Sequence, residues 1–167
     1  MELVLPSERY GESFLAAEQE MFAAGDREDI ITAETLPAKL VRWEAMRQGV
    51  LADTRVPSTV WWLVETSRDE FIGRIAIRHF IDERLRRFGG HIGYDVRPSR
   101  RREGIGTRML RLAMPHAKLL GIDPAMLTCD KNNIASRRMI ESCGGSVSEE
   151  FEYEGTTRLR LWLPTSQ

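Results

Sequence analysis

The sequence predicts an α+β fold, within the broad α/β class, built on one mixed and mostly antiparallel sheet. Segments with a strand pattern alternate with segments whose apolar residues recur at helical spacing. Several strands also follow one another across short turns, which is typical of antiparallel hairpins. At 167 residues the chain has the length of a single domain, and we expect one domain over residues 1–167.

The composition indicates a globular protein without a strong overall charge. Hydrophobic residues make up 42% of the chain, charged residues 29%, and the formal net charge is −1. We therefore expect neither nucleic acid nor a membrane as a partner. Two cysteines form no disulfide framework, and the N-terminus has no secretory segment, so we expect a cytoplasmic protein. Three scattered histidines and the lack of a Cys-x-x-Cys motif predict no metal site.

The first third of the chain is predicted to form a short strand and two helices. Glu2–Leu5 has a strand pattern, and Pro6 ends it. Apolar residues recur at helical spacing through Tyr10–Ala24, where Gly25 follows as a stop signal. A second helix is predicted at Leu36–Gly49 from a regular apolar stripe. Such stripes indicate packing against a core.

The middle of the chain is predicted to form three strands. After a loop at Thr54–Ser58, the segment Thr59–Glu65 is rich in β-branched and aromatic residues. Phe71–His79 alternates in the next strand, and these two strands would form a hairpin. Ile81–Phe88 is predicted to be a charged connection. The central strand then follows at His91–Val96.

The last third is predicted to form two helices, a strand and a hairpin. A helix begins after the glycines near residue 105 and ends at Gly121, with Pro115 inside it. Because proline lacks the N–H donor and clashes with the preceding turn, we expect a kink or a restarted helix there. The remaining elements are a strand at Ala125–Cys129, a helix at Ala135–Cys143, and a hairpin of Ser146–Tyr153 and Thr156–Pro164 that turns at Gly155.

The most informative stretch joins the central strand to the next helix. Arg101, Gly104 and Gly106 stand there in the pattern Arg-x-x-Gly-x-Gly, among six arginines between Arg97 and Arg111. Glycines allow close approach of a ligand, and the free N–H groups of a first helical turn bind anions. The stretch therefore predicts a site for a phosphate-bearing cofactor. A Walker loop is excluded by its glycine spacing, and a dinucleotide fingerprint by Met109 at the third glycine position.

This stretch resembles the signature of the GNAT family of N-acetyltransferases, Arg/Gln-x-x-Gly-x-Gly/Ala. A Tyr-Asp-Val-Arg-Pro strand end precedes it, and a strand, Asn133 and the helix from Ala135 to Gly144 follow. The resemblance extends over Ile72–Phe151. The runs Gly-Gly-His-Ile-Gly-Tyr and Thr-Cys-Asp-Lys-Asn-Asn indicate an uncharacterised bacterial subgroup.

The resemblance implies both a fold and a reaction. The fold has six or seven strands with helices on both faces, and two neighbouring strands splay apart to admit the pantetheine arm of acetyl-CoA. The reaction is direct transfer of an acetyl group from acetyl-CoA to a primary amine of a small molecule or peptide, in a ternary complex. A non-catalytic acyl-CoA-binding regulatory module is the alternative. A homodimer stays an open expectation.

The resemblance also assigns the residues that would bind the cofactor. The backbone of Tyr94, Asp95 and Val96 would pair with the pantetheine amides as an added strand. Asn133 would contact the cofactor after the next strand. The loop for the pyrophosphate would consist of Arg101, Arg102, Glu103, Gly104, Ile105, Gly106 and Thr107.

The resemblance leaves the catalytic groups less defined. Glutamates that serve as bases in the family correspond to Gly90 and Thr128, so both are absent here. His91 and Asp130 lie beside these two positions and are the candidate bases; the ordinary pKa of histidine lies near neutrality. The tyrosine that protonates the leaving sulfur in many members corresponds to Ile140. We therefore expect no dedicated tyrosine acid, and CoA would leave as the thiolate or take its proton from water.

The resemblance places the acceptor between the loop of the first two helices and the last hairpin. In this chain these segments are Gly25–Thr35 and Phe151–Thr157, and both contain several acidic residues. An acidic lining would favour a cationic amine. An ordinary solvated rim is the interpretation that we favour.

Overall fold

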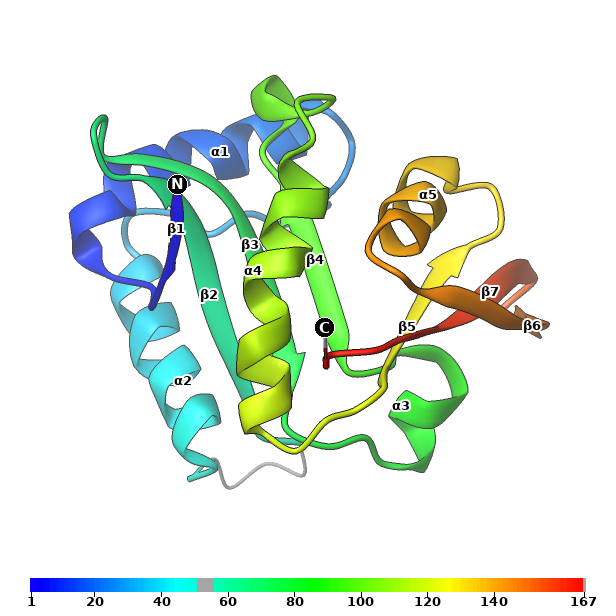
Figure 1. Ribbon diagram of the computed structural model, residues 1–167. Coiled ribbons are helices and arrows are strands. Elements are labelled where there is room, and N and C mark those ends of the chain that lie inside the picture. The colour runs from blue at the N-terminus through cyan, green and yellow to red at the C-terminus, as the bar shows by residue number, and fades with distance from the viewer. Residues whose placement is uncertain (51–55, 167) are drawn as a thin grey trace.

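A computed structural model describes residues 1–50 and 56–166 of the chain. It confirms the α+β class, and the elements follow one another as shown in Figure 1. The first half contains β1 (Glu2–Val4), a 3-10 turn (Glu8–Tyr10), α1 (Gly11–Ala23), α2 (Leu36–Gln48), β2 (Ser58–Glu65), β3 (Glu70–Arg78) and α3 (Glu83–Phe88). The second half contains β4 (Ile92–Val96), a 3-10 turn (Pro98–Arg100), α4 (Ile105–Leu119), β5 (Ala125–Asp130), α5 (Ile134–Ser142), β6 (Ser146–Tyr153) and β7 (Thr156–Leu163).

The strands form two antiparallel sheets, with the orders β1-β2-β3-β4 and β5-β7-β6. In the described part of the chain, the two sheets are joined by one isolated bridge between Gly90 and Leu127. Next to it, the His91 N–H donates to the Met126 carbonyl oxygen at 2.7 Å. The sheet that the sequence predicted as continuous is therefore divided between β4 and β5.

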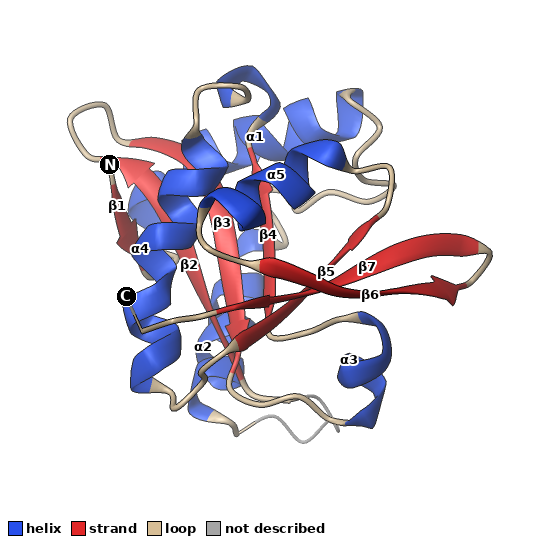
Figure 2. Cartoon of the chain, turned by 45° about the vertical axis from the view of Figure 1, so that its right-hand side comes forward, coloured by secondary structure: helices blue, strands red, loops and turns tan. Residues whose placement is uncertain are grey.

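From this bridge, β4 and β5 run in the same direction and diverge (Figures 1 and 2). Gly90 permits the close approach at their foot, because its φ is +71° and a Cβ there would collide with the Met126 carbonyl oxygen. No other residue type fits this junction without a shift of the backbone. The splay that the family resemblance implies is thus present, and its fixed end lies at Gly90.

Helices cover both faces of the four-stranded sheet. α1 and α2 pack on one face, where the Phe14 ring stacks on Trp62 at 4.5 Å between centroids. α4 covers the other face, where Leu63 belongs to the same buried cluster as Met109. Trp62 and Leu63 are neighbours in β2 and both have 0% exposure. Because successive side chains of a strand point to opposite faces, β2 contributes to both cores.

Three stretches differ from the prediction or lie partly outside the structure. The connection predicted at Ile81–Phe88 contains α3, which Asp82 caps by accepting a hydrogen bond from the Leu85 N–H at 2.7 Å. α4 continues through Pro115 without restarting. The first two residues of the loop predicted at Thr54–Ser58 lie outside the described residues, and Ser58 begins β2.

Burial explains why α4 continues through its proline. A proline in a helix interior costs roughly 3 kcal/mol. The face of α4 that covers the sheet buries Met109, Leu110 and Met114, and a fully buried side chain of this size contributes about 1.5–3 kcal/mol. The packing therefore outweighs the missing hydrogen bond. None of the described helices is long and apolar enough to span a membrane.

Candidate functional site

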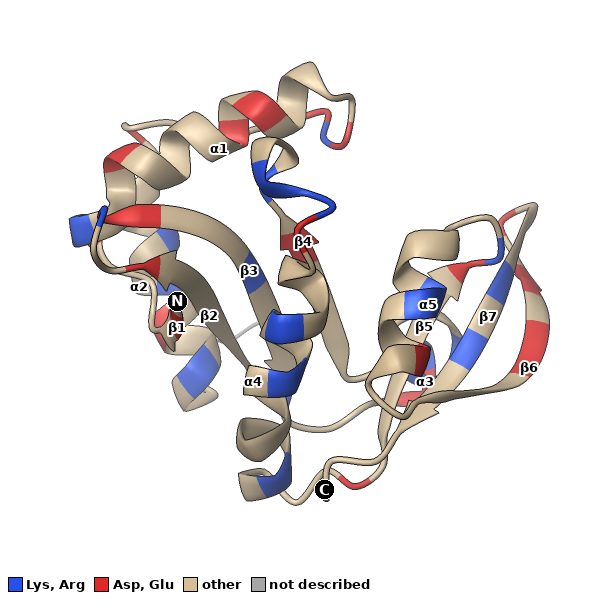
Figure 3. Ribbon diagram, turned by 45° about the horizontal axis from the view of Figure 1, so that its top comes forward, with Lys and Arg blue, Asp and Glu red and all other residues tan. Residues whose placement is uncertain are grey.

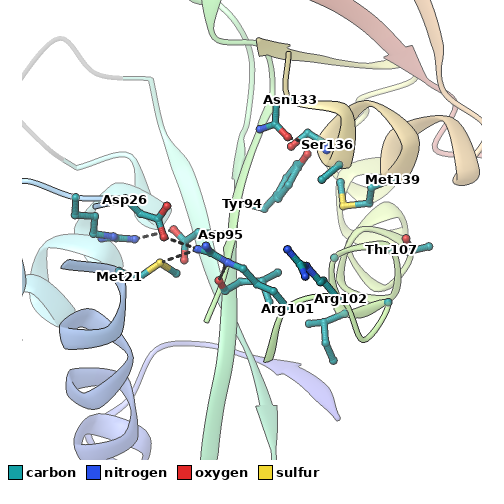
Figure 4. A pocket seen from close by; sticks show the side chains of 16 residues that line it. Met21, Asp26, Tyr94, Asp95, Arg101, Arg102, Thr107, Asn133, Ser136 and Met139 are labelled. Atoms are coloured by element: carbon teal, nitrogen blue, oxygen red, sulfur yellow. Dashed lines mark hydrogen bonds and ion pairs between the residues drawn. The ribbon is translucent and has the colours of Figure 1, made fainter. Parts of the chain in front are cut away.

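A cleft of about 750 Å³ opens beside the C-terminal end of β4 (Figure 4). Four segments contribute to it: the end of α1 with the residues that follow, the end of β4, the loop with the first turn of α4, and the start of α5. The lining residues are Met21, Asp26, Arg27, Tyr94, Asp95, Val96, Arg101, Arg102, Gly104, Ile105, Gly106, Thr107, Asn133, Ala135, Ser136 and Met139.

The cleft brings together the residues that the sequence predicted for the cofactor. Tyr94, Asp95 and Val96 line the cleft from β4, and the glycine loop lines it from the start of α4. Asn133 lines it from the other side of the gap between β4 and β5. Glu103 is the exception, since it does not line the cleft. Its carboxylate accepts a hydrogen bond from the Nε of Arg100 at 3.3 Å.

The loop before α4 presents backbone donors to the cleft. Arg102 and Gly104 both have left-handed backbone conformations, with φ values of 66° and 73°. The first bond of the helical ladder runs from the Arg108 N–H to the Gly104 carbonyl oxygen at 3.1 Å. The N–H groups of residues 105–107 precede this bond, so the helix itself does not satisfy them. Such a turn with the positive end of the helix dipole forms an anion-binding concavity.

Most arginines near this loop are already paired with carboxylates, so the loop has less free positive charge than the sequence suggests. Three of them form ion pairs at 2.6–2.7 Å: Arg97 with Glu20, Arg100 with Glu70, and Arg101 with Asp26. These pairs fasten the basic loop to α1, to the turn after α1 and to the start of β3. Figure 3 shows this loop beside α1. Arg102 is exposed, lines the cleft, and forms no ion pair with any described residue. It is the loop arginine available to an anionic ligand.

A second ionic cluster fixes the segment after α1 against β4. The Asp95 Oδ2 accepts hydrogen bonds from the Arg27 Nη2 at 2.8 Å and from the Arg74 Nε at 2.9 Å. Arg27 also pairs with Glu18, whose side chain is 3% exposed, at 3.1 Å. Burial raises the pKa of both carboxyls, and Arg74 opposes this effect at each of them. The cluster holds Arg27 at the rim of the cleft.

Tyr94 and Asn133 lie where β4 faces the start of α5. The Asn133 Oδ1 accepts a hydrogen bond from the Ser136 N–H at 3.0 Å and so caps α5. The Tyr94 side chain extends toward the same place (Figure 4). Burial raises the pKa of Tyr94 to about 12, although a hydrogen bond with Ser136 acts in the opposite direction. Its hydroxyl therefore keeps its proton at neutral pH.

The two candidate bases lie outside the lining of the cleft. The His91 Nδ1 accepts a hydrogen bond from the Met126 N–H at 2.9 Å, at the foot of the splay. Burial and neighbouring arginines lower the pKa of His91, which keeps it neutral at pH 7. Asp130 forms an ion pair with Arg158 at 3.1 Å at the exposed end of β5. Ile140, at the position of the family tyrosine, is fully buried in the core.

Several lining residues were not assigned to the cofactor from the sequence. Asp26 and Arg27 belong to the segment predicted for the acceptor, and their charges are the signal that could have linked them to Arg101 and Asp95. Ser136 and Met139 follow Asn133 at helical spacing, so extending the match along α5 would have found them. Met21 carried no such signal, because its position in an apolar stripe indicates only a core residue.

Neither the cysteines nor a metal offers an alternative chemistry within the described residues. Cys129 and Cys143 are both buried and form no disulfide bond within the described residues. Burial raises the pKa of Cys129, so its thiolate, the nucleophilic form, is scarce at neutral pH. The described residues contain no group of three or more His, Cys, Asp or Glu side chains placed to hold a metal ion.

Sequence comparison relates the chain to acetyltransferases. A family model described as an acetyltransferase (GNAT) domain matches residues 15–146. The N-acetyltransferase family 8 member 3 of Rattus norvegicus is 32% identical over 101 residues, which are 60% of this chain. The matched region spans 44% of that protein, so less than half of its length has a counterpart here.

Solved structures share the fold across nearly the whole chain. The ribosomal-protein-S5-alanine acetyltransferase of Vibrio fischeri has a TM-score of 0.72 and 11% identity, covering 99% of this chain and 93% of that one. The structure of yncA from Salmonella typhimurium with its cofactor acetyl-CoA has a TM-score of 0.66 and 15% identity, covering 99% and 94%. At these identities the likeness concerns the fold alone.

Proposed function

This chain belongs to the GNAT family of acetyltransferases, and we propose from this that it transfers the acetyl group of acetyl-CoA to a primary amine. The observation that carries the proposal is the turn before α4, where free backbone donors and Arg102 face a cleft beside the splayed strands. A pyrophosphate needs donors and positive charge of this kind. The relative from Salmonella typhimurium was solved with acetyl-CoA, which is the same cofactor.

We propose that the pantetheine arm lies along the free edge of β4. β3 pairs with the other edge of β4, from Ile92 to Val96, so the edge that faces β5 has no strand partner among the described residues above the Gly90 bridge. An amide-bearing ligand can add to such an edge as a further strand. With the pyrophosphate at the loop, the thioester would reach back along β4 toward Gly93.

We propose direct transfer rather than an acetyl-enzyme. The amine nitrogen attacks the thioester carbonyl carbon, the carbon–sulfur bond breaks, and the sulfur of CoA takes up a proton. Cys129 is a poor nucleophile because its pKa is raised by burial. Tyr94 is protonated at neutral pH and lies in the cleft, so in place of the solvent expected from the sequence we propose Tyr94 as the proton donor to the sulfur. The positions of His91 and Asp130 favour solvent as the acceptor of the amine proton.

We propose an amine-bearing small molecule or peptide as the acceptor, and residues 1–167 as one acetyltransferase domain. A cytoplasmic location agrees with two buried cysteines that form no disulfide bond within the described residues. The relative from Vibrio fischeri is named for the acetylation of an alanine of a ribosomal protein, so a peptide amine is one class of acceptor to test. Arg27, the arginine of the first segment expected to contact the acceptor, is already paired with Glu18 and Asp95.

Thiol release from acetyl-CoA in the presence of a panel of amines tests this function. At least one amine should raise the release above the background hydrolysis, with intersecting double-reciprocal lines. CoA binding without turnover for every amine would support the alternative, a non-catalytic acyl-CoA-binding module.

The same assay tests the role of Tyr94. Tyr94→Phe should lower kcat by about a hundredfold, the lower end of the effect of a proton-transfer group, with CoA affinity unchanged. Tyr10→Phe is the matched control, since Tyr10 is buried in the core under α1 and α2 and lines neither the cleft nor another described pocket. Equal kcat values for Tyr94→Phe and the wild type would remove Tyr94 from the mechanism.

A further inference from the structure

A second groove, of about 1010 Å³, lies near the start of β4, whereas the cofactor cleft lies at its end. Its wall consists of the C-terminal part of α2, the first residue of β2, the last residue of β3, and α3 with the residues on either side of it. Ser58 and Arg78 line it from the sheet, and Phe88 and Gly89 line it beside the junction of the two sheets.

The groove lies on the face of the sheet that α1 and α2 cover. The buried side chains of the cofactor site lie on the other face, under α4. Ser58 and Arg78 are direct cross-strand partners. Ser58 is two residues before Val60, which packs in the α1–α2 core, so both side chains point to that face. Tyr94 and Val96 of β4 instead pack against the core under α4. A ligand in the groove would therefore approach β4 from the side away from the pantetheine.

Arg78 is a half-buried cation without a counter-ion among the described residues. Arg74 lies four residues earlier in β3, on the same face, and pairs with Asp95 at 2.9 Å. Burial lowers the pKa of Arg78, Arg84 adds to this effect, and the weaker field of Asp82 opposes it. A guanidinium that loses its hydration on folding without forming an ion pair lowers the stability of the folded protein. Such a charge beside a groove is typical of a ligand site.

Two donors, the Arg78 Nη2 and the Ser58 hydroxyl, can donate hydrogen bonds into the groove. The Arg78 Nη1 donates to the Gly90 carbonyl oxygen at 2.8 Å, which anchors the guanidinium at the foot of β4. Its Nη2 makes no hydrogen bond to a described residue. Ser58 is buried, with 4% of the residue exposed, and its hydroxyl likewise has no hydrogen-bond partner in the described part of the chain. A carboxylate bound between them would satisfy both groups.

We propose that Arg78 and Ser58 bind a carboxylate of the acceptor, so that the acceptor carries this group as well as the amine that is acetylated. This inference rests on the proposed acetyl transfer. The amine would lie at Gly93, where a Cβ would meet nothing within 4 Å. The Arg78 N–H donates to the His91 carbonyl oxygen, which places Arg78 beside His91, two residues before Gly93.

The spacing along β4 sets the length of the acceptor. Two residues of a strand span about 7 Å, so carboxylate and amine should be separated by about this distance. An ω-amino acid such as 6-aminohexanoate, or lysine with its side-chain amine, has this length in an extended conformation. A short α-amino acid that offers only its α-amine is too compact to reach both places.

The test compares kcat/KM for 6-aminohexanoate and n-hexylamine, which differ by the carboxylate. The wild type should prefer 6-aminohexanoate by about tenfold, the effect of one charge-assisted hydrogen bond of about 1.4 kcal/mol. Arg78→Gln should abolish the preference, while Arg68→Gln, an exposed arginine in the turn after β2, should keep it. Because Arg78 also holds Gly90, Ser58→Ala provides a second variant that leaves this contact intact. It should lower the preference severalfold.

Four outcomes would overturn the inference. Equal kcat/KM values for the two amines in the wild type would show that no carboxylate is recognised. A fall in kcat/KM in Arg78→Gln that is the same for both amines would assign Arg78 a structural role. Recovery of hexylamine turnover by added hexanoate would indicate a separate effector site. Absence of turnover with every amine, despite CoA binding, would contradict the proposed function and remove this inference with it.

Discussion

Among single residues, the arginines around the cleft have two different roles. Arg97, Arg100 and Arg101 each pair with a carboxylate from a distant part of the chain, whereas Arg102 faces the cleft and pairs with no carboxylate among the described residues. Arg102 also adopts the left-handed conformation that turns the loop, at a typical cost of roughly 1–2 kcal/mol for a side-chain-bearing residue. Strain at a free cation beside a phosphate-type turn indicates a functional role.

Arg102→Ala should weaken CoA binding by about tenfold and reduce its dependence on salt. The lost contact is a charge-assisted hydrogen bond at an exposed site, which contributes at the lower end of about 1.5–3 kcal/mol. Calorimetry at two salt concentrations measures both effects. Arg101→Ala should weaken CoA binding less, because the guanidinium of Arg101 already pairs with Asp26 at 2.6 Å. A larger loss in Arg101→Ala than in Arg102→Ala would reverse this assignment.

The sequence predicts which residues line the cofactor cleft better than it predicts their partners. The glycine motif and the strand end before it are local, so Tyr94–Val96 and the loop could be placed from the motif alone. The partner of Arg97 is Glu20, 77 residues away, and the partner of Arg101 is Asp26, 75 residues away. Pairings at such separations depend on how α1 packs over the sheet, which periodicity does not specify.

Among the elements, α1 is held against the loop before α4 by its acidic residues. The Glu20 Oε1 accepts a hydrogen bond from the Arg97 Nε at 2.7 Å, and its Oε2 accepts one from the Ser99 N–H at 3.0 Å. One side chain therefore fixes both the end of β4 and the start of the loop. The position of the phosphate-binding turn depends on this contact.

Glu20→Gln should destabilise the protein at pH 7, and this difference should shrink in acid. Burial opposes ionisation of Glu20, but its hydrogen bonds with Arg97 and Ser99 outweigh this effect and lower its pKa below the usual value of a glutamate. A carboxyl with a lowered pKa in the folded state stabilises fully above its unfolded pKa and loses this contribution as pH falls through the folded value. Urea unfolding of both proteins at pH 7 and pH 3.5 measures the difference. A difference that is constant or grows in acid would contradict the role of Glu20.

The long helices and strands were predicted well from the sequence. The short helix α3 and the division of the sheet between β4 and β5 were not. α3 has six residues, too few for a reliable period, and its last carbonyls accept hydrogen bonds from Arg158 and Arg160 of β7. The division of the sheet depends on the contact of Gly90 with Met126, which joins two strands only at their foot. Both features arise from tertiary contacts that no single segment encodes.

In the whole molecule, two sheets share one junction and open away from it. The cofactor cleft lies at the open end of β4, and the groove at Arg78 lies near the junction, toward the other face. This arrangement lets a CoA thioester and an amine approach β4 from opposite sides, as direct transfer requires. Holding both reactants in one geometry is itself a large part of catalysis of this kind.

The central claim is that the turn before α4 binds the pyrophosphate of CoA, and calorimetry with CoA on Gly104→Asp tests it most directly. Gly104 has a φ of +73°, and a Cβ there would enter open space, so aspartate would put a side chain and a negative charge where the anion lies. Gly155→Asp is the matched control, with a φ of +75° and open space at the β6–β7 turn. The wild type and Gly155→Asp should bind CoA equally, and Gly104→Asp should show no binding heat. Unchanged CoA affinity in a folded Gly104→Asp would contradict the claim.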